Sequence, residues 1–203
     1  METFTSLDIT TRSQTPTLWV FGCSHSYGVG LRPGEKNYGA LLADQLDMPL
    51  KLVAKPGSST QFSLRHLINA DIQADDIVVW QLSTAERCSY RRGELVNEIM
   101  IATQPPGSIF LDFFTDDQIF FHHVSLLNMG AMYLRAKKVN FAFISIFSGL
   151  KTTELLHTEY QKYPEYCNTN NYEVDKGTDR LHTGPRSHQN ISNSLYNHIQ
   201  SNL

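Results

Sequence analysis

The sequence has no excess of basic residues, because its 17 Lys and Arg are outnumbered by 20 Asp and Glu and the net charge is −3. Binding to nucleic-acid phosphates usually requires a basic surface, so this composition argues against a nucleic-acid partner. No apolar run reaches the roughly 18 residues of a membrane-spanning helix. The opening residues, METFTSLDITTRSQTP, also lack the apolar core of a secretory signal peptide. We therefore expect a cytoplasmic protein that makes no contact with a membrane.

Cysteine is also scarce. The three cysteines, Cys23, Cys88 and Cys167, are far apart and odd in number, which argues against a disulfide framework and against a CxxC metal site. Free thiols are expected instead. The eight histidines include no pair four residues apart, and the adjacent His122 and His123 would lie on different faces of a helix. We expect neither a metal ion nor another cofactor.

The composition that remains is that of a globular protein, with 41% hydrophobic and 18% charged residues. At 203 residues the chain is long enough for one core, so we expect a single domain over residues 1–203. Short apolar runs bounded by breakers predict buried parallel strands at 17–22, 76–82 and 139–147, with a weaker one at 49–55. Helical stretches at 37–46 and 59–71 lie between them. This alternation predicts an α/β fold with a mostly parallel sheet and right-handed crossovers.

The second half of the chain contains clearer helix signals. Thr115 and Gln118 have the spacing of a capping box, and the apolar pattern that follows continues to the basic pair Lys137 and Lys138. A final helix is expected near Pro185, since proline suits the first helical position. Residues 87–114 are too long for an ordinary connection and are interpreted as an insertion. Residues 150–178 are polar and tyrosine-rich, with one continuous turn-forming stretch, CNTNNYEVDKGTDR.

The run TLWVFGCSHSYGVGL, residues 17–31, places Ser24 directly after the first strand. Ligands of open parallel sheets bind beyond the carboxyl ends of the strands. A serine nucleophile also needs a nearby histidine base that a third group orients. Asp179 and His182, in the stretch TDRLHTGPRSHQ, are three residues apart, which lets the carboxylate accept from one ring nitrogen. These residues predict a triad in the order Ser, Asp, His.

These motifs resemble those of the SGNH/GDSL hydrolases, which are esterases and acyl-hydrolases with a flavodoxin-like, three-layer α/β/α fold. The segment GCS at 22–24 is similar to the family's G-D-S block, and DRLH to its D-x-x-H block. The resemblance implies that Ser24 is the nucleophile, His182 the base and Asp179 the orienting acid. It also implies an oxyanion hole formed by the backbone N–H groups of Ser24 and Gly57.

The chain departs from the family pattern at two places. Cys23 stands where the family has aspartate, and the G-x-N-D block is represented only by QLST at 81–84. Ser83 would then take the asparagine position as a third oxyanion donor, although a hydroxyl is shorter than an amide. Thr84 is the alternative donor and a candidate substrate contact. Arg87 is a candidate for binding an anionic substrate group.

Each of these residues also has a structural interpretation. Ser24 would serve as a helix cap, the Asp179–His182 pair as a cap and a surface histidine, and Gly57 as a turn residue. A thiolate at Cys23 is an alternative nucleophile, since the start of a helix activates cysteine. The arginines of the insertion would form a solvated basic loop; they are Arg87, Arg91 and Arg92.

We interpret the sequence as that of a serine hydrolase acting on a small-molecule or carbohydrate ester, with a carbohydrate O-acetyl group as one candidate substrate. Two alternatives stay open. One is an acyltransferase that uses the same triad with an alcohol acceptor. The other is a binding module that kept the fold and lost its oxyanion hole. The altered third block favours the binding module, and the complete triad favours the enzymes.

Overall fold

The computed structural model describes residues 15–92, 95–100, 115–146, 151–169 and 172–202. Its strands are β1 (Leu18–Gly22), β2 (Leu50–Ala54), β3 (Ile77–Leu82), β4 (Arg87–Arg92), β5 (Leu95–Met100) and β6 (Asn140–Ser145). Its helices are α1 (Ser24–Tyr27), α2 (Tyr38–Leu46), α3 (Thr60–Asn69), α5 (Asp116–Ala136), α6 (Lys151–Tyr160) and α7 (Pro185–Asn202). In these ranges, no helix is both long and apolar enough to span a bilayer.

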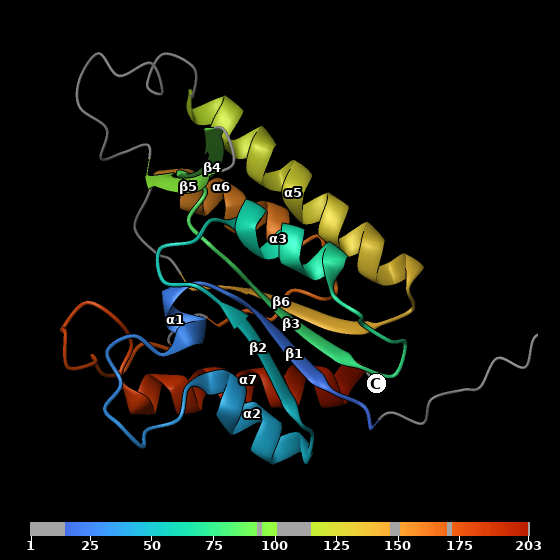
Figure 1. Ribbon diagram of the computed structural model, residues 1–203, viewed down its shortest axis with the longest axis vertical. Helices are drawn as coiled ribbons and strands as arrows, with labels where there is room; N and C mark the ends of the chain where they lie inside the picture. Colours follow the sequence, from blue (N-terminus) through green and yellow to red (C-terminus); the bar gives the residue numbers. More distant parts are fainter. Residues whose placement is uncertain (1–14, 93–94, 101–114, 147–150, 170–171, 203) are drawn as a thin grey trace, which may run out of the picture.

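Four strands form a parallel sheet in the order β2-β1-β3-β6 (Figure 1). Val20, in the middle of β1, lies opposite Leu52 on β2 and Val79 on β3. The inner strands β1 and β3 are buried along their whole length, as expected for apolar runs without alternation. All four strands predicted from the sequence are confirmed, each to within two residues at its ends.

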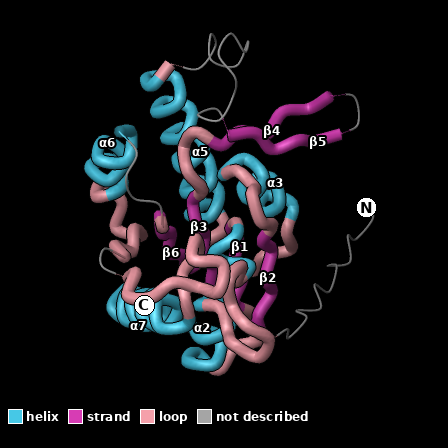
Figure 2. The backbone as a smooth tube through the Cα atoms, turned by 90° about the vertical axis from the view of Figure 1, so that its left-hand side faces the viewer, coloured by secondary structure: helices cyan, strands magenta, loops and turns pink. Residues whose placement is uncertain are grey.

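Helices cover both faces of this sheet and give it three layers (Figures 1 and 2). Trp19 and Phe21 of β1 join the core under α3 and α5, whereas Leu18 and Val20 join the core under α2 and α7. This division follows from the two-residue period of a strand, which sends neighbouring side chains to opposite faces. The expected three-layer α/β/α fold is confirmed.

The helix predicted from the capping box is α5. Thr115 Oγ1 accepts from the backbone N–H of Gln118, and the Thr115 N–H donates to Gln118 Oε1 at 2.9 Å. Farther along α5, a Cβ added to Gly130 would lie 2.2 Å from the ring of Trp80, so glycine is what lets this helix approach the sheet. The final helix, α7, begins at Pro185 as predicted.

The sequence did not predict α6, which lies within the polar, tyrosine-rich stretch at 150–178. Its buried side chains Leu156 and Tyr160 are one helical turn apart and belong to the core on the α5 side. The remaining residues of this helix are mostly polar. The apolar stripe of this helix is therefore too narrow to indicate a helix from the sequence alone.

The expected insertion at 87–114 begins with the antiparallel hairpin β4–β5, in which Arg87 lies opposite Met100. Residues 101–114 lie outside the described residues. The hairpin projects from the α/β body beside α3 (Figure 2). At its base, the Ser89 N–H donates to Gln61 Oε1 at 2.7 Å, and the Ser89 and Ser59 hydroxyls are 2.7 Å apart. The insertion thus starts at the carboxyl end of the sheet and is tied to α3.

Candidate active site

The first strand ends in a sharp turn into α1 that Gln81 holds in place. Gln81 Oε1 accepts from the Ser26 N–H at 3.1 Å and from the Ser26 hydroxyl at 2.5 Å. Its Nε2 donates to Cys23 Sγ at 3.1 Å. A Cβ on Gly22 would lie 2.1 Å from Ser26 Oγ, so no larger residue fits there. Gln81 was not among the residues predicted from the sequence, because its only signal is an amide inside an otherwise apolar strand.

Ser24 is the first residue of α1, directly beyond the carboxyl end of β1. The N-cap position belongs to Cys23, so the interpretation of Ser24 as a helix cap is wrong. Within the described residues, the Ser24 hydroxyl donates only toward Cys23 Sγ, at the long distance of 3.9 Å. The residue is 7% exposed. Its hydroxyl therefore lies at the edge of the site without a structural hydrogen bond of normal length.

Gly57 lies in a turn that faces the same edge of the sheet. Pro56 and Gly57 are its two central residues, the turn is closed by a 3.1 Å bond from Ser58 N–H to the Lys55 carbonyl, and Gly57 has φ of +79°. The Ser58 hydroxyl ties the turn to the end of β1 by donating to the Gly22 carbonyl at 3.2 Å. In the described part of the chain, the backbone N–H groups of Ser24 and Gly57 donate to no acceptor. Both N–H groups are therefore available to donate to a ligand.

The side chains that follow β3 are already engaged. The Ser83 hydroxyl donates to the Ser58 carbonyl at 2.8 Å, and the same carbonyl accepts from Arg87 Nη1 at 3.3 Å. Arg87 Nη1 also lies 3.2 Å from Ser83 Oγ. Thr84 Oγ1 donates to Glu86 Oε2 at 2.5 Å. Because a serine hydroxyl carries one hydrogen, Ser83 in this arrangement has none left for an oxyanion.

Asp179 and His182 make the contact expected from their spacing. The distance from His182 Nδ1 to Asp179 Oδ2 is 2.5 Å, and the ring donates to the carboxylate. The other carboxylate oxygen accepts from the backbone N–H groups of Leu181 and His182, each at 3.0 Å. The backbone N–H of His182, its ring and the N–H of Leu181 together hold the pKa of the Asp179 carboxyl at about 2. The carboxylate therefore stays ionised and fixes the orientation of the imidazole.

The loop that carries this pair is docked on the segment that follows α1. The Thr178 N–H and hydroxyl both donate to the Gly30 carbonyl, at 2.8 and 3.1 Å. A Cβ added to Gly30 would lie 3.0 Å from Asp179 Oδ1 and 3.3 Å from His182 Cβ. A Cβ added to Gly177 would lie 2.7 Å from the Gly30 carbonyl oxygen. Two glycines thus bring the loop of His182 against the segment of Ser24.

The triad predicted from the sequence implies that Gly177→Ala lowers kcat for ester hydrolysis by about tenfold or more, because the new methyl group would push the His182 loop away from Gly30 and misplace the predicted base. Steady-state kinetics with an aryl acetate would measure the loss, and circular dichroism would check the fold. Gly34→Ala is the control for backbone strain without a clash, since Gly34 has φ of +91° but a Cβ there has no neighbour within 4 Å. Equal kcat for Gly177→Ala and wild type would contradict this account.

Within the described residues, no hydrogen bond joins Ser24 to His182, so their direct contact stays a prediction; such bonds often tighten only when substrate binds. No group of three or more His, Cys, Asp or Glu side chains in these ranges is arranged to hold a metal ion. The predicted roles of Arg91 and Arg92 concern side chains outside the described set.

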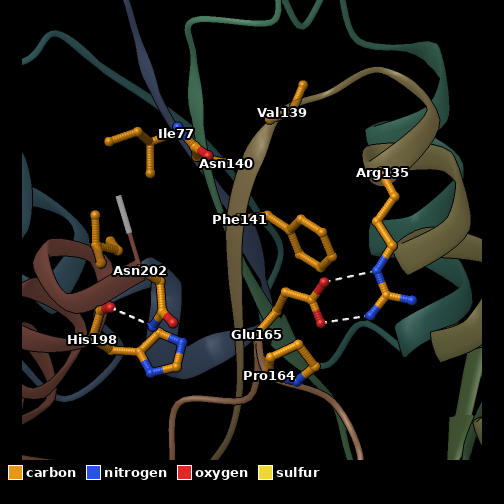
Figure 3. A pocket seen from close by; sticks show the side chains of 10 residues that line it. Ile77, Arg135, Val139, Asn140, Phe141, Pro164, Glu165, His198 and Asn202 are labelled. Atoms are coloured by element: carbon orange, nitrogen blue, oxygen red, sulfur yellow. Dashed lines mark hydrogen bonds and ion pairs between the residues drawn. The ribbon is translucent and has the colours of Figure 1, made fainter.

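A cavity of about 290 Å³ lies elsewhere, at the amino ends of β3 and β6 (Figure 3). Ile77 and Asn140, the first residues of those strands, line it together with the ion pair between Arg135 and Glu165. Ser24 lies at the opposite edge of the parallel sheet, beyond the carboxyl end of β1. This cavity is therefore separate from the candidate active site.

Comparison with solved structures relates this architecture to known enzymes. A carbohydrate esterase family 2 enzyme from Corynascus thermopiles (Myceliophthora fergusii) superposes with a TM-score of 0.60 and 13% identity, covering 95% of this chain and 68% of that one. The acetyl xylan esterase Est2A from Butyrivibrio proteoclasticus gives a TM-score of 0.58 and 14% identity over 92% of this chain and 64% of its own. A lipolytic G-D-S-L family member from Veillonella parvula gives a TM-score of 0.54 and 9% identity over 89% and 96%.

The chain has the SGNH/GDSL hydrolase fold. It spans about two thirds of the length of the two carbohydrate esterases. No family model and no curated protein matches the sequence. The structural neighbours of this SGNH/GDSL fold include esterases and lipases, and the resemblance inferred from GCS and DRLH is confirmed at the level of the fold.

Proposed function

We propose that this protein is a serine esterase that uses Ser24, His182 and Asp179. The observation that carries the proposal is the 2.5 Å hydrogen bond between His182 and Asp179, on a loop packed against the segment that follows Ser24. An ionised carboxylate that holds one ring nitrogen leaves the other nitrogen of the imidazole able to act as a base. The Ser24 hydroxyl caps no helix, lies directly beyond the carboxyl end of β1, and makes no hydrogen bond of normal length among the described residues.

The reaction proceeds in two halves. Ser24 Oγ attacks the acyl carbon of the ester while His182 Nε2 takes the hydroxyl proton. The tetrahedral intermediate then collapses, the ester C–O bond breaks, and His182 returns the proton to the departing alcohol. A water molecule attacks the acyl-serine with His182 again as base, which releases the carboxylic acid and restores Ser24. Asp179 keeps the imidazole in the required tautomer throughout and stabilises its charged form.

The oxyanion is stabilised by the backbone N–H groups of Ser24 and Gly57. Both amides are open donors in the described part of the chain, and Gly57 lies next to Ser58, which is bonded to the end of β1. Ser83 contributes as a third donor only when its bond to the Ser58 carbonyl breaks. Arg87 Nη1 already donates to that carbonyl at 3.3 Å, so it keeps a partner when Ser83 leaves.

We propose a carbohydrate O-acetyl ester as the substrate class, because the neighbours in fold include a carbohydrate esterase and an acetyl xylan esterase. A transferase with an alcohol acceptor would use the same residues and differ only in what attacks the acyl-serine. The second candidate function is a non-catalytic binding module. The observation that favours it is the engagement of Ser83 with Ser58, which leaves the oxyanion hole with two backbone donors.

A fluorophosphonate probe tests the proposal directly, because it phosphonylates an activated serine. We expect one adduct, mapped by mass spectrometry to Ser24 and absent from Ser24→Ala and His182→Ala. Labelling at Cys23 would assign the nucleophile to the thiol. A protein that neither reacts with the probe nor turns over any acetyl ester would support the binding module and overturn the esterase.

A further inference from the structure

A chain of buried side chains links the Ser24 helix to the His182 loop. His25 Nδ1 lies 3.1 Å from Thr183 Oγ1, and Thr183 Oγ1 lies 3.2 Å from His188 Nε2. At the far end, the Tyr38 N–H donates to His188 Nδ1 at 3.1 Å. His25 directly follows Ser24, and Thr183 directly follows His182. We call this set, from His25 through Thr183 to His188, the histidine relay.

The donor and acceptor at each step of the relay can be assigned by starting from the bond between the Tyr38 backbone and His188. The Tyr38 backbone can only donate, so His188 Nδ1 must accept and the His188 proton sits on Nε2. Nε2 then donates to Thr183 Oγ1, whose own hydrogen is donated to His25 Nδ1. Thr183 Oγ1 has no other acceptor among the described residues. His25 is left as the tautomer with its proton on Nε2.

The relay carries no charge at neutral pH. Burial, and then the neighbouring His182, lower the pKa of His25 to about 3, and burial lowers the pKa of His188 to about 4. Both rings are therefore neutral, which agrees with the assignment above of one ring proton to each histidine. Neutrality matters for the proposed reaction, because a charged ring at His25 would oppose protonation of the base beside it.

His25 also packs directly on the base. Its ring centroid is 5.2 Å from that of His182, and the two ring planes are inclined at 57°. His25 is 8% exposed, and its partner Thr183 is 1% exposed. The relay holds the His25 ring at Nδ1. The far end of the relay is fixed to α2 and α7, because the ring of Tyr38 on α2 stacks on the ring of His188 on α7. His182 thus packs against a fixed, neutral imidazole and is also bonded to Asp179.

We propose that His25 is a positioning residue for the base, held by the histidine relay so that the His182 ring faces Ser24. This role rests on the esterase mechanism proposed above and extends it. His25 is placed next to the nucleophile in sequence and against the base in space. It therefore couples the position of α1 to that of the His182 loop.

Two pairs of variants test the proposal by kinetics. Thr183→Val removes the relay hydroxyl but keeps the side-chain shape, and we expect kcat to fall about tenfold to a hundredfold with KM changed less than about twofold. His25→Asn retains an acceptor near the Nδ1 position and should keep more activity than His25→Leu. Thr17→Val is the matched control: it loses a hydroxyl that donates to the Thr15 carbonyl at 3.3 Å, directly before β1 and at the opposite end of the sheet from the relay. Wild-type kcat in Thr183→Val or in His25→Leu would overturn the proposal.

Nitrogen-15 spectra of the histidine rings separate this proposal from the esterase mechanism, because they need no turnover. In the wild type we expect His25 as a neutral ring protonated at Nε2. Thr183→Val should give His25 averaged tautomer shifts and displace the ring signals of His182, while Thr17→Val should leave both sets unchanged. If the wild type is inactive but these shifts occur, the positioning role holds and the esterase does not. Unchanged His182 signals in Thr183→Val would overturn the positioning role whether or not the protein is an enzyme.

Discussion

Ser24→Ala is expected to lower kcat/KM for an aryl acetate by about 10⁴-fold or more, since a serine triad that loses its nucleophile retains only the contributions of binding and the oxyanion hole. The fold should survive, because the Ser24 hydroxyl makes only the 3.9 Å contact with Cys23 Sγ and caps no helix. Steady-state hydrolysis and the far-ultraviolet circular dichroism spectrum together measure the effect. Loss of activity with an unchanged spectrum is the expected pair of results.

Two further variants separate the triad from its alternatives. Cys23→Ala should keep most of the activity, because Cys23 is 1% exposed and its sulfur accepts from Gln81 at 3.1 Å, as in a structural thiol. The double variant Ser24→Ala/His182→Ala should be scarcely slower than Ser24→Ala, since triad members act as a unit. Full additivity of the two losses, or wild-type turnover in Ser24→Ala, would refute the mechanism.

Acid should destabilise the protein steeply between pH 6.5 and about pH 4, because three buried histidines are neutral in the folded state. Burial lowers the pKa of His25 to about 3, and of His123 and His188 to about 4 each. The unfolded chain takes up these protons near pH 6.5 and the folded chain does not, so the stability present above pH 6.5 is lost as the pH falls. Three protons correspond to about 4 kcal/mol per pH unit around pH 5. Over the whole window that slope removes at most about 10 kcal/mol, which is comparable to the typical stability of about 5–15 kcal/mol of a folded protein.

Urea unfolding at a series of pH values, followed by the fluorescence of the buried Trp19 and Trp80, measures this slope. His123→Gln should reduce it by about a third, because the amide oxygen replaces the Nε2 that lies 2.8 Å from the Tyr160 hydroxyl and takes up no proton. His66→Gln, at an exposed position of α3, should change it far less. A stability that stays level from pH 7 to pH 5 would show that these rings are not buried and neutral.

Features that depend on neighbours in the chain could be predicted from the sequence. The capping box of Thr115 and Gln118 is formed within one helical turn. The Asp179–His182 bond needs only three residues of spacing. The four strands of the main sheet were predicted from short apolar runs bounded by breakers, a pattern typical of strands buried on both faces. In each case the local pattern and the final fold favour the same conformation, so the prediction needed no knowledge of the rest of the molecule.

The contacts that complete the candidate site could not be predicted, because they join residues far apart in sequence. His25 and Thr183 are separated by 158 positions and Gln81 and Cys23 by 58. The sequence around His25 or Gln81 does not indicate which residue each one will bond, since a buried histidine or glutamine is compatible with many hydrogen-bond arrangements.

The close packing of Gly177 against Gly30 could not be predicted from the sequence either, for a related reason. A glycine in a loop usually indicates a turn, and only the packed structure shows that the missing side chain makes room for another backbone. The engagement of Ser83 with Ser58 is of the same kind. Sequence pattern therefore identified the candidate chemical groups and the sheet edge at which they gather. Tertiary packing decided which of them are held in place, which are left open and which are already bonded, because those outcomes depend on distances that only the folded chain defines.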